Sequence, residues 1–207
     1  MAKNFLQTFF IENGTKEIVA KGEMIIRIEK SPQSIFFIEK GHVGAYIGQE
    51  NQLQAIYRKG DMFPFSHHVM YSSVYYAMTE TILRILPSKR LYNLVEKDNR
   101  IARDLVHVLI ERADLLKDRL TIVTTRTTYF RVIQWILFAG MHFGKQKRKV
   151  LEISLIATQQ ELANALATTR ETINRIFSKL EKKGLIRTDQ EVLRIPSIKN
   201  LQKEISS

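Results

Sequence analysis

The sequence predicts an α+β protein in three parts: an N-terminal antiparallel β-roll of the jelly-roll type, one long helix, and a C-terminal unit of short helices followed by a hairpin. Short β-branched and aromatic runs alternate with Gly and Pro turn signals over roughly the first 90 residues. An apolar heptad pattern then runs from Asp98 to Thr125, and two short amphipathic segments lie between Thr158 and Leu180. The predicted limits of the parts are 1–97, 98–125 and 126–207.

Composition excludes several classes of protein. The 207 residues include no cysteine, which excludes disulfides, thiolate metal sites, cysteine-ligated iron–sulfur clusters and cysteine nucleophiles. No run of 18 apolar residues is present, so no membrane span is expected. The N-terminal residues lack the apolar core and cleavage site of a secretory signal, and we expect a cytoplasmic location.

The net charge of +11 is concentrated in the C-terminal part. Residues 126–207 hold 15 Lys and Arg against 7 Asp and Glu, a net charge of +8. Such a charge is compatible with a solvated basic surface. Together with a helix-turn-helix it indicates a polyanionic partner, and DNA above all.

The first part is expected to consist of short strands. Turn signals such as Lys21-Gly22, Ser31-Pro32 and Lys40-Gly41 separate the runs, and this regular spacing is typical of an antiparallel roll or sandwich. The expected strands are Ile18–Ala20, Met24–Ile28, Ser34–Ile38, Val43–Ile47, Gln52–Arg58, Ser73–Ala77 and Thr81–Leu86.

The long helix is expected to have two apolar faces. On one face the spacing alternates between four and three residues, as in a coiled coil, so we expect this seam to pair with a second copy of the chain. The other face is expected to pack on the roll; burial within one domain is the alternative. The seam consists of Ala102, Val106, Leu109, Ala113, Leu116, Leu120 and Val123. The other face consists of Ile101, Leu105, Val108, Ile110, Leu115 and Ile122.

Residues 124–128, Thr-Thr-Arg-Thr-Thr, indicate a hinge after this helix. A further helix is expected over Tyr129–His142, ended by Gly144. The segment from Lys145 to Lys149 is expected to be a basic loop, either solvated or lying on phosphates. A short strand is expected over Leu151–Leu155.

The segment from Thr158 to Leu180 predicts a helix-turn-helix. Thr158 stands three residues before Glu161, and Thr168 three before Glu171, which predicts a capping box at the start of each helix. The second helix is expected over residues 169–180. Leu185–Arg187 and Val192–Ile195 flank a polar turn and predict a hairpin, which completes a winged helix-turn-helix. The apolar positions of the two helices are Leu162, Ala163, Leu166, Ile173, Ile176, Phe177 and Leu180.

The outward face of the second helix carries side chains that match base edges in a major groove. Arg170 and Arg175 can pair with guanine, Glu171 with cytosine and Asn174 with adenine. Phosphate contacts would fix the position of the helix on the duplex. The residues expected to make them are Thr158, Thr168, Thr169 and Lys179.

The order of these parts resembles the CRP/FNR family of bacterial transcription regulators. The resemblance spans essentially the whole chain and is strongest at TTRETINRIFSKLEKKGLI, residues 168–186. Arg170, Glu171 and Arg175 match the recognition helix of the cAMP-receptor branch, which uses them on a G·C-containing half-site. Asn174 stands where the family carries a small residue, and Ala167 where its turn commonly carries glycine.

The ligand-binding part departs from the cyclic-nucleotide pattern. Members that bind cAMP carry a Gly-Glu-Leu segment and an Arg-Ser or Arg-Thr pair, which hold the cyclic phosphate. Here Pro64-Phe65-Ser66 and Ser72-Ser73 stand in those places, and no arginine lies between Arg58 and Arg84. Leu116-Lys117 replaces the Thr-Ser pair that reads adenine. The resemblance therefore implies a regulator that is not controlled by cAMP.

The segment from Gly60 to Tyr71 leaves two interpretations of the roll open. Some family members bind haem through histidine, and imidazole is a good iron ligand, so His67, His68 or His107 are candidates for a sensor of haem or another small molecule. Alternatively, apolar side chains fill the roll and no cofactor is needed. The possible pocket residues are Met62, Phe63, Phe65, His67, His68 and Tyr71.

These patterns lead to one principal hypothesis and one alternative. The principal hypothesis is a homodimeric regulator that reads a near-palindromic DNA operator, with RNA polymerase as a further partner implied by the resemblance. The alternative is a small-molecule or haem sensor in which a ligand of the roll switches DNA binding. We find no Gly-rich phosphate loop, His-x-x-x-His pair or clear nucleophile–base pair, so neither catalysis nor a metal site is expected.

Overall fold

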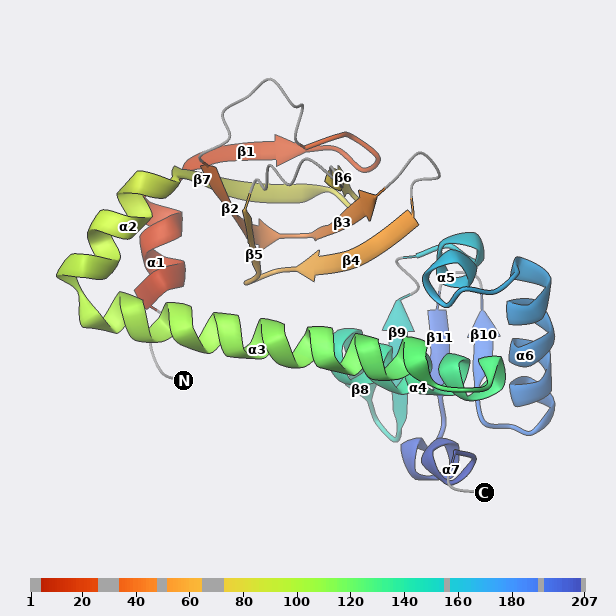
Figure 1. The fold of residues 1–207 in the computed structure, drawn as a ribbon. Coiled ribbons are helices and arrows are strands. Elements are labelled where there is room, and N and C mark those ends of the chain that lie inside the picture. The colour runs from red at the N-terminus through yellow and green to blue at the C-terminus, as the bar shows by residue number, and fades with distance from the viewer. Residues whose placement is uncertain are drawn as a thin grey trace. The chain divides into compact units, whose positions relative to one another are not determined.

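The computed structural model describes residues 5–25, 34–47, 52–64, 73–154, 157–189 and 192–205. It divides into two compact units, Met1–Asp114 and Leu115–Ser207, and the boundary between them falls inside one long helix (Figure 1). Among the described helices none has both the length and the apolar character needed to cross a membrane. The three-part limits expected from the sequence stay predictions.

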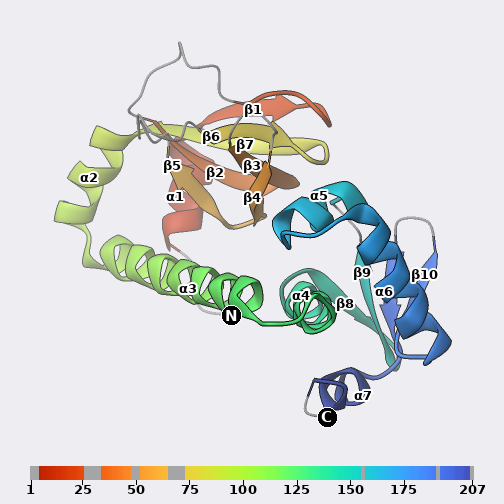
Figure 2. The same ribbon diagram turned by 45° about the vertical axis from the view of Figure 1, so that its right-hand side comes forward.

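The first unit contains the antiparallel β-roll expected from the sequence (Figure 2). One sheet has the strand order β1-β7-β2-β5, and the other has the order β4-β3-β6. β1 begins three residues before the expected start at Ile18, because it pairs with β7 along its whole length. Of the expected strand Met24–Ile28, residues 26–28 lie outside the described residues, and Met24 forms an isolated antiparallel bridge with Tyr76. The strands are β1 Thr15–Val19, β2 Ser34–Lys40, β3 His42–Ile47, β4 Gln52–Arg58, β5 Met62–Pro64, β6 Ser73–Ala77 and β7 Thr81–Pro87.

Strand β2 separates two hydrophobic cores. Because successive side chains of a strand point to opposite faces, Phe36 and Ile38 enter the core between the sheets, whereas Phe37 enters a second core on the outer face. The inner core also contains Val19, Val43, Ala45, Phe63, Tyr75, Ala77 and Leu83.

Three helices cover the outer face of that sheet: α1 Phe5–Asn13, α2 Ser88–Lys97 and the start of α3. The expectation of strands throughout this part was wrong for α1. Leu6 and Phe10 are fully buried there, and the Phe10 ring stacks on that of Phe37 with centroids 5.3 Å apart. So short a helix is stabilised by such packing rather than by its own propensity, which explains why the local sequence did not reveal it.

Helix α3, Asn99–Thr124, is the long helix expected over 98–125. Ile101 is buried in the core of the first unit and Ile122 in that of the second. The expectation that the second apolar face packs on the roll was wrong for Ile122, which lies in the core of the second unit, and for Ile110, because 55% of its surface is exposed. Ile110 lies four residues after Val106 and three before Ala113, so helical geometry places it beside the seam.

The second unit is the winged helix-turn-helix expected from the sequence. Its sheet has the order β10-β11-β9-β8, and all neighbouring strands are antiparallel. One core joins this sheet to α4, α5 and α6 through residues such as Ile133, Ile153 and Leu193. The elements are α4 Thr128–Phe143, β8 Gly144–Lys147, β9 Val150–Ser154, α5 Gln159–Ala165, α6 Arg170–Lys182, β10 Arg187–Asp189, β11 Val192–Ile195 and α7 Ile198–Lys203.

The basic loop expected from Lys145 to Lys149 is partly a strand, because β8 includes Lys145 to Lys147, and only Arg148 and Lys149 form a turn. β8 pairs with β9 so that Lys145 stands opposite Glu152, and Lys147 Nζ lies 2.7 Å from Glu152 Oε2. Opposite charges on neighbouring strands stabilise such pairing. The local sequence of this segment does not show which strand it pairs with. Helix α7 was not predicted either; it buries Leu201 in the same core.

The turn between β2 and β3 provides a test of the roll. Gly41 has φ +97°, and a Cβ placed there would lie 2.5 Å from the Glu80 carbonyl oxygen. We predict that Gly41→Ala lowers the free energy of unfolding by about 3 kcal/mol or more, since the clash adds to left-handed strain of about 1–2 kcal/mol.

Gly22→Ala is the matched control, because Gly22 has φ +86° but no atom of the described residues lies within 4 Å of its Cβ position. Urea unfolding of both variants measures the difference. Equal destabilisation of the two would show that the contact with Glu80 is unimportant.

Candidate nucleic-acid interface

Helix α5 begins with the capping box expected from the sequence. The Thr158 hydroxyl accepts a hydrogen bond from the Glu161 amide at 3.2 Å, and the Thr158 amide donates to Glu161 Oε2 at 2.7 Å. These bonds satisfy two of the donors that a helix N-terminus leaves unpaired. The Thr158 hydroxyl can still donate its own proton, as a phosphate contact requires.

Helix α6 begins differently from the expectation. The capping residue is Thr169, not Thr168: its hydroxyl accepts from the Thr172 amide at 3.2 Å and lies 2.9 Å from the Thr172 hydroxyl. The Thr168 amide instead donates to the Ala163 carbonyl of α5 at 2.9 Å. Thr168 therefore belongs to the turn. The sequence did not show which of the two adjacent threonines caps the helix. The helix extends to Lys182, two residues beyond the expected end.

The two faces of α6 are clearly separated. Ile173, Ile176, Phe177 and Leu180 are buried in the core of the second unit. Because a helix turns by about 100° per residue, the opposite face points outward. The side chains predicted to contact bases all lie there and are exposed: Arg170, Glu171, Asn174 and Arg175.

The residues expected on phosphates have different surroundings. Thr158 and Thr169 are exposed, whereas Thr168 is half-buried. Lys179 is exposed, but its Nζ lies 4.5 Å from the centroid of the Tyr129 ring, a cation–π contact. A phosphate would therefore have to compete with this ring for the Lys179 ammonium.

Tyr129 also anchors the end of α6 to the C-terminal segment. Its hydroxyl donates to Glu204 Oε1 at 2.7 Å, and the same carboxylate forms an ion pair with Lys183. The hydrogen bonds from Lys183 and Tyr129 lower the pKa of Glu204. Burial and the bond to Glu204 raise the pKa of Tyr129. Sequence reading missed this contact, because its members lie on three separate elements.

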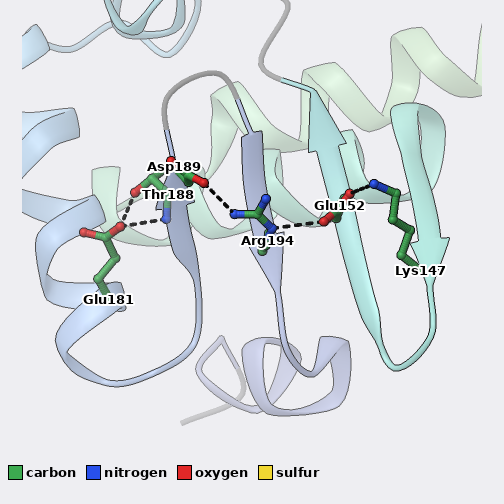
Figure 3. Close-up of polar contacts among 6 residues, drawn as sticks. All are labelled: Lys147, Glu152, Glu181, Thr188, Asp189 and Arg194. Atoms are coloured by element: carbon green, nitrogen blue, oxygen red, sulfur yellow. Dashed lines mark hydrogen bonds and ion pairs between the residues drawn. The ribbon is translucent and has the colours of Figure 1, made fainter.

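The sheet beside α6 is tied together by a row of charges (Figure 3). Glu152 on β9 accepts from Lys147 on β8 at 2.7 Å and from Arg194 on β11 at 3.0 Å. Arg194 also contacts Asp189 on β10 at 3.2 Å. Each of the four strands therefore contributes one residue to the row.

The wing strand β10 is also attached directly to α6. Figure 3 shows the Glu181 carboxylate beside Thr188, whose amide donates to it at 2.8 Å and whose hydroxyl contacts the same oxygen. Since Glu181 lies in the last turn of α6, these hydrogen bonds fix the position of the wing strand relative to this helix.

Two family models match the chain in the order of these parts: a cyclic nucleotide-binding domain over residues 16–98 and a Crp-like helix-turn-helix domain over residues 130–204. Electron transport regulator A of Shewanella oneidensis is 22% identical over 176 residues, which cover 83% of this chain and 70% of that protein. The fumarate and nitrate reduction regulatory protein of Escherichia coli is 20% identical over 179 residues, with 83% and 70% covered. The chain belongs to the CRP/FNR family.

A solved structure supports the same fold for this CRP/FNR-family chain. A mutant of CooA from Carboxydothermus hydrogenoformans superposes with a TM-score of 0.81 at 21% identity, covering all of this chain and 97% of that one. The family models and relatives together identify the chain as a DNA-binding transcription regulator. The exposed face of α6 is accordingly the candidate nucleic-acid interface.

The roll of a CRP/FNR protein is the part that corresponds to the cyclic nucleotide-binding domain, and here its described interior is aromatic. The Phe63 ring stacks between those of Phe36 and Tyr75, with centroids 5.1 Å and 4.8 Å away, and Tyr57 lies 5.3 Å from Phe63. Arg112 of α3 places its guanidinium 3.9 Å from the Tyr57 centroid. Burial, followed by the effect of Tyr57, raises the pKa of Tyr75 to about 12.

The possible pocket residues are only partly within the described chain. Phe63 is fully buried in the inner core, and Met62 packs against the outer core. Phe65, His67, His68 and Tyr71 lie outside the described residues, as does most of the segment in place of the cyclic-phosphate motif. His107 is exposed on α3.

Asp61, near the aromatic interior, provides a pH-dependent test. Burial raises the pKa of its carboxyl, although the Arg58 amide and the charge of Arg112 oppose this. A carboxyl whose folded pKa is raised loses stability as the pH rises from its unfolded pKa through its folded pKa. We predict that Asp61→Asn raises the melting temperature above this pH window and leaves it unchanged at lower pH, because the amide still accepts from Arg58.

Asp98→Asn is the control of opposite sign. Hydrogen bonds from Arg100 lower the pKa of Asp98 to about 2. Its contribution is present above the unfolded pKa and is lost as the pH falls through the folded pKa. Melting temperatures of both variants across acid and neutral pH test the pair. A melting temperature for Asp61→Asn below that of the wild type at neutral pH would refute the assignment.

Proposed function

We propose that this CRP/FNR-family regulator acts as a homodimer that places one α6 per subunit in adjacent major grooves of a near-palindromic operator, without requiring cAMP. The single observation that carries this proposal is the exposed polar face of α6, whose side chains match base edges. Two-fold symmetry of the protein would require two half-sites about one helical turn, roughly 34–36 Å, apart. RNA polymerase is the expected protein partner at the promoter.

The apolar seam of α3 supports the dimer. In one chain Leu109, Leu116 and Leu120 leave 58%, 56% and 62% of their surfaces exposed, and Val106 and Val123 leave 53% and 44%. Exposed apolar residues that repeat with heptad spacing along a helix are typical of a coiled-coil interface. The heptad spacing makes the surface self-complementary, so a second copy of the same helix is the partner it fits.

The exposed face of α6 supports specific recognition. Arg170 and Arg175 can each donate two hydrogen bonds to a guanine, and Glu171 can accept from the amino group of cytosine. Glu171 lies in the first turn of α6, where the helix dipole favours a carboxylate. These groups would discriminate among base pairs, while hydroxyls and lysines would contact phosphates.

The roll interior supports independence from cAMP. Phe36, Phe63 and Tyr75 fill the inner core with stacked rings, and the Arg112 guanidinium lies on Tyr57. No arginine occurs between Arg58 and Arg84 to neutralise a cyclic phosphate. A buried phosphate without such a partner would be strongly disfavoured.

The dimer is tested by changing the seam. We predict that Leu120→Asp weakens self-association by about 4 kcal/mol, the order expected for an unpaired carboxylate in an apolar interface. Sedimentation equilibrium should show twice the chain mass for the wild type and the single-chain mass for the variant.

Thr121→Asp introduces the same charge one residue away, on an exposed position outside the seam, and should remain dimeric. A wild type that sediments as a monomer at all concentrations would reject the dimer.

Recognition is tested by selection from random DNA without added effector. We predict enrichment of a near-palindrome, unchanged by cAMP. Arg175→Ala should lose about 1–3 kcal/mol of affinity and relax the preference at one base pair per half-site, because one bidentate contact is removed.

Lys199→Ala removes a positive charge from the exposed surface of α7 and serves as the control, since it should leave the base preference unchanged. Selection that enriches no palindrome, or that enriches one only with cAMP, would contradict the proposal.

A further inference from the structure

The turn between α5 and α6 adopts a conformation that its sequence does not favour. The Thr168 amide donates to the Ala163 carbonyl at 2.9 Å, and the Ala167 amide to the Asn164 carbonyl at 3.2 Å. This pair of bonds is a Schellman motif, which requires a left-handed residue between them. Ala167 occupies that position with φ +49°, although its Cβ makes the conformation unfavourable.

The end of α6 contains the same motif with the usual residue. The Leu185 amide donates to the Leu180 carbonyl at 3.0 Å, and the Gly184 amide to the Glu181 carbonyl at 2.8 Å. Gly184 has φ +69° there, and glycine adopts this conformation without strain. The two motifs therefore differ in the residue at the left-handed position, and at Ala167 some other interaction must compensate for the strain.

Arg131 of α4 makes a contact at that turn. Its Nη1 donates to the Leu166 carbonyl at 2.8 Å, and its Nη2 donates to the Thr128 hydroxyl at 3.0 Å. Leu166 is the C-terminal capping residue of α5, so its carbonyl is one of those that the helix leaves without a partner. A cation at a helix C-terminus is also favoured by the helix dipole.

The guanidinium is held in place by these two bonds. Its Nε is buried and has no hydrogen-bond partner within the described part of the chain. A buried donor without a partner is unfavourable. The Nε therefore does not hold the guanidinium in this position, and the two Nη hydrogen bonds do. Arg131 also lies one turn from the start of α4, whose first residue, Thr128, is the last residue of the expected hinge segment 124–128.

We propose that Arg131 is a positioning residue for DNA binding: by holding the Leu166 carbonyl it keeps Ala167 left-handed and fixes the direction in which α6 leaves the turn. It contacts no DNA itself. Its effect reaches the bases through α6, whose first exposed side chain, Arg170, stands only three residues after Ala167. The inference rests on the DNA-binding role of the family but on neither the dimer nor the palindrome.

The test compares Arg131→Met with Arg126→Met. Both remove one positive charge and leave an apolar side chain; Arg126 is exposed in the hinge segment. Fluorescence anisotropy gives the affinity for the best sequence enriched by selection, palindromic or not, and for unrelated DNA. Arg131→Met should lower the ratio of specific to unrelated affinity by about tenfold, as expected from loss of a charged hydrogen bond at the turn. Arg126→Met should leave the ratio unchanged.

The salt dependence separates positioning from direct contact. If Arg131 touched a phosphate, Arg131→Met would weaken binding to all sequences and reduce the salt slope by about one. Positioning predicts an unchanged slope and an unchanged affinity for unrelated DNA. Ala167→Gly in the Arg131→Met background should restore part of the ratio of specific to unrelated affinity, because glycine adopts the left-handed conformation without the hydrogen bond from Arg131.

Amide hydrogen exchange tests the turn without any DNA. In Arg131→Met the amides of Ala167 and Thr168 should exchange about tenfold faster than in Arg126→Met, whereas the amides of Gly184 and Leu185 should not change. Unchanged exchange at Ala167 and Thr168 overturns the proposal even if no sequence is enriched. A reduced salt slope, or a specific-to-unrelated ratio equal to that of the wild type, also overturns it.

Discussion

Burial of one face of α6 is the interaction on which the DNA-binding part of the molecule depends. Ile173, Phe177 and Leu180 enter a core shared with α4, α5 and the four-stranded sheet. Each such side chain contributes on the order of 1.5–3 kcal/mol when buried, more than a helix cap of typically about 1 kcal/mol. Burial therefore decides which face of α6 is outward, and the caps decide only where the helix begins.

Polar contacts fix what burial leaves adjustable, namely the ends of α6. The Glu181 carboxylate accepts from the Thr188 amide of the wing, Lys183 forms an ion pair with Glu204, and the Tyr129 hydroxyl donates to the same Glu204 carboxylate. At the other end Arg131 holds the turn before the helix. Apolar packing is not directional, whereas a hydrogen bond specifies a distance and an angle. A helix that must match base edges needs apolar packing to fix its outward face and hydrogen bonds to fix the position of its ends.

The two apolar faces of α3 have different surroundings. Ile101 and Ile122 are buried within the chain, and Arg112 reaches Tyr57 in the roll. From Val106 onward the heptad residues, with Ile110 beside them, are exposed, whereas Ala102 is half-buried. Within the first unit, the Arg112 guanidinium connects α3 to the aromatic interior of the roll through its contact with the Tyr57 ring.

The sequence by itself determined the parts that depend on local patterns. β-Branched and aromatic runs separated by turn signals predicted the roll, and the heptad pattern predicted α3. The 3–4 spacing from Leu162 to Leu180 predicted the helix-turn-helix together with the outward position of Arg170 and Arg175. Hydrophobic periodicity encodes burial directly, so these features can be read from one chain.

Only the tertiary structure decided the features that depend on a distant partner. The pairing of β8 with β9, the folding of α1 on Phe37 and the contact of Arg131 with Leu166 each join separate segments. The cap of α6 is different, because it is local: Thr168 and Thr169 are adjacent candidates, and the Thr168 amide bonds to Ala163 in the turn while Thr169 caps the helix. Arg131 stands 35 residues from Leu166 along the chain. A hydrogen bond between such distant groups is specified by packing of the elements that carry them, which no local pattern encodes.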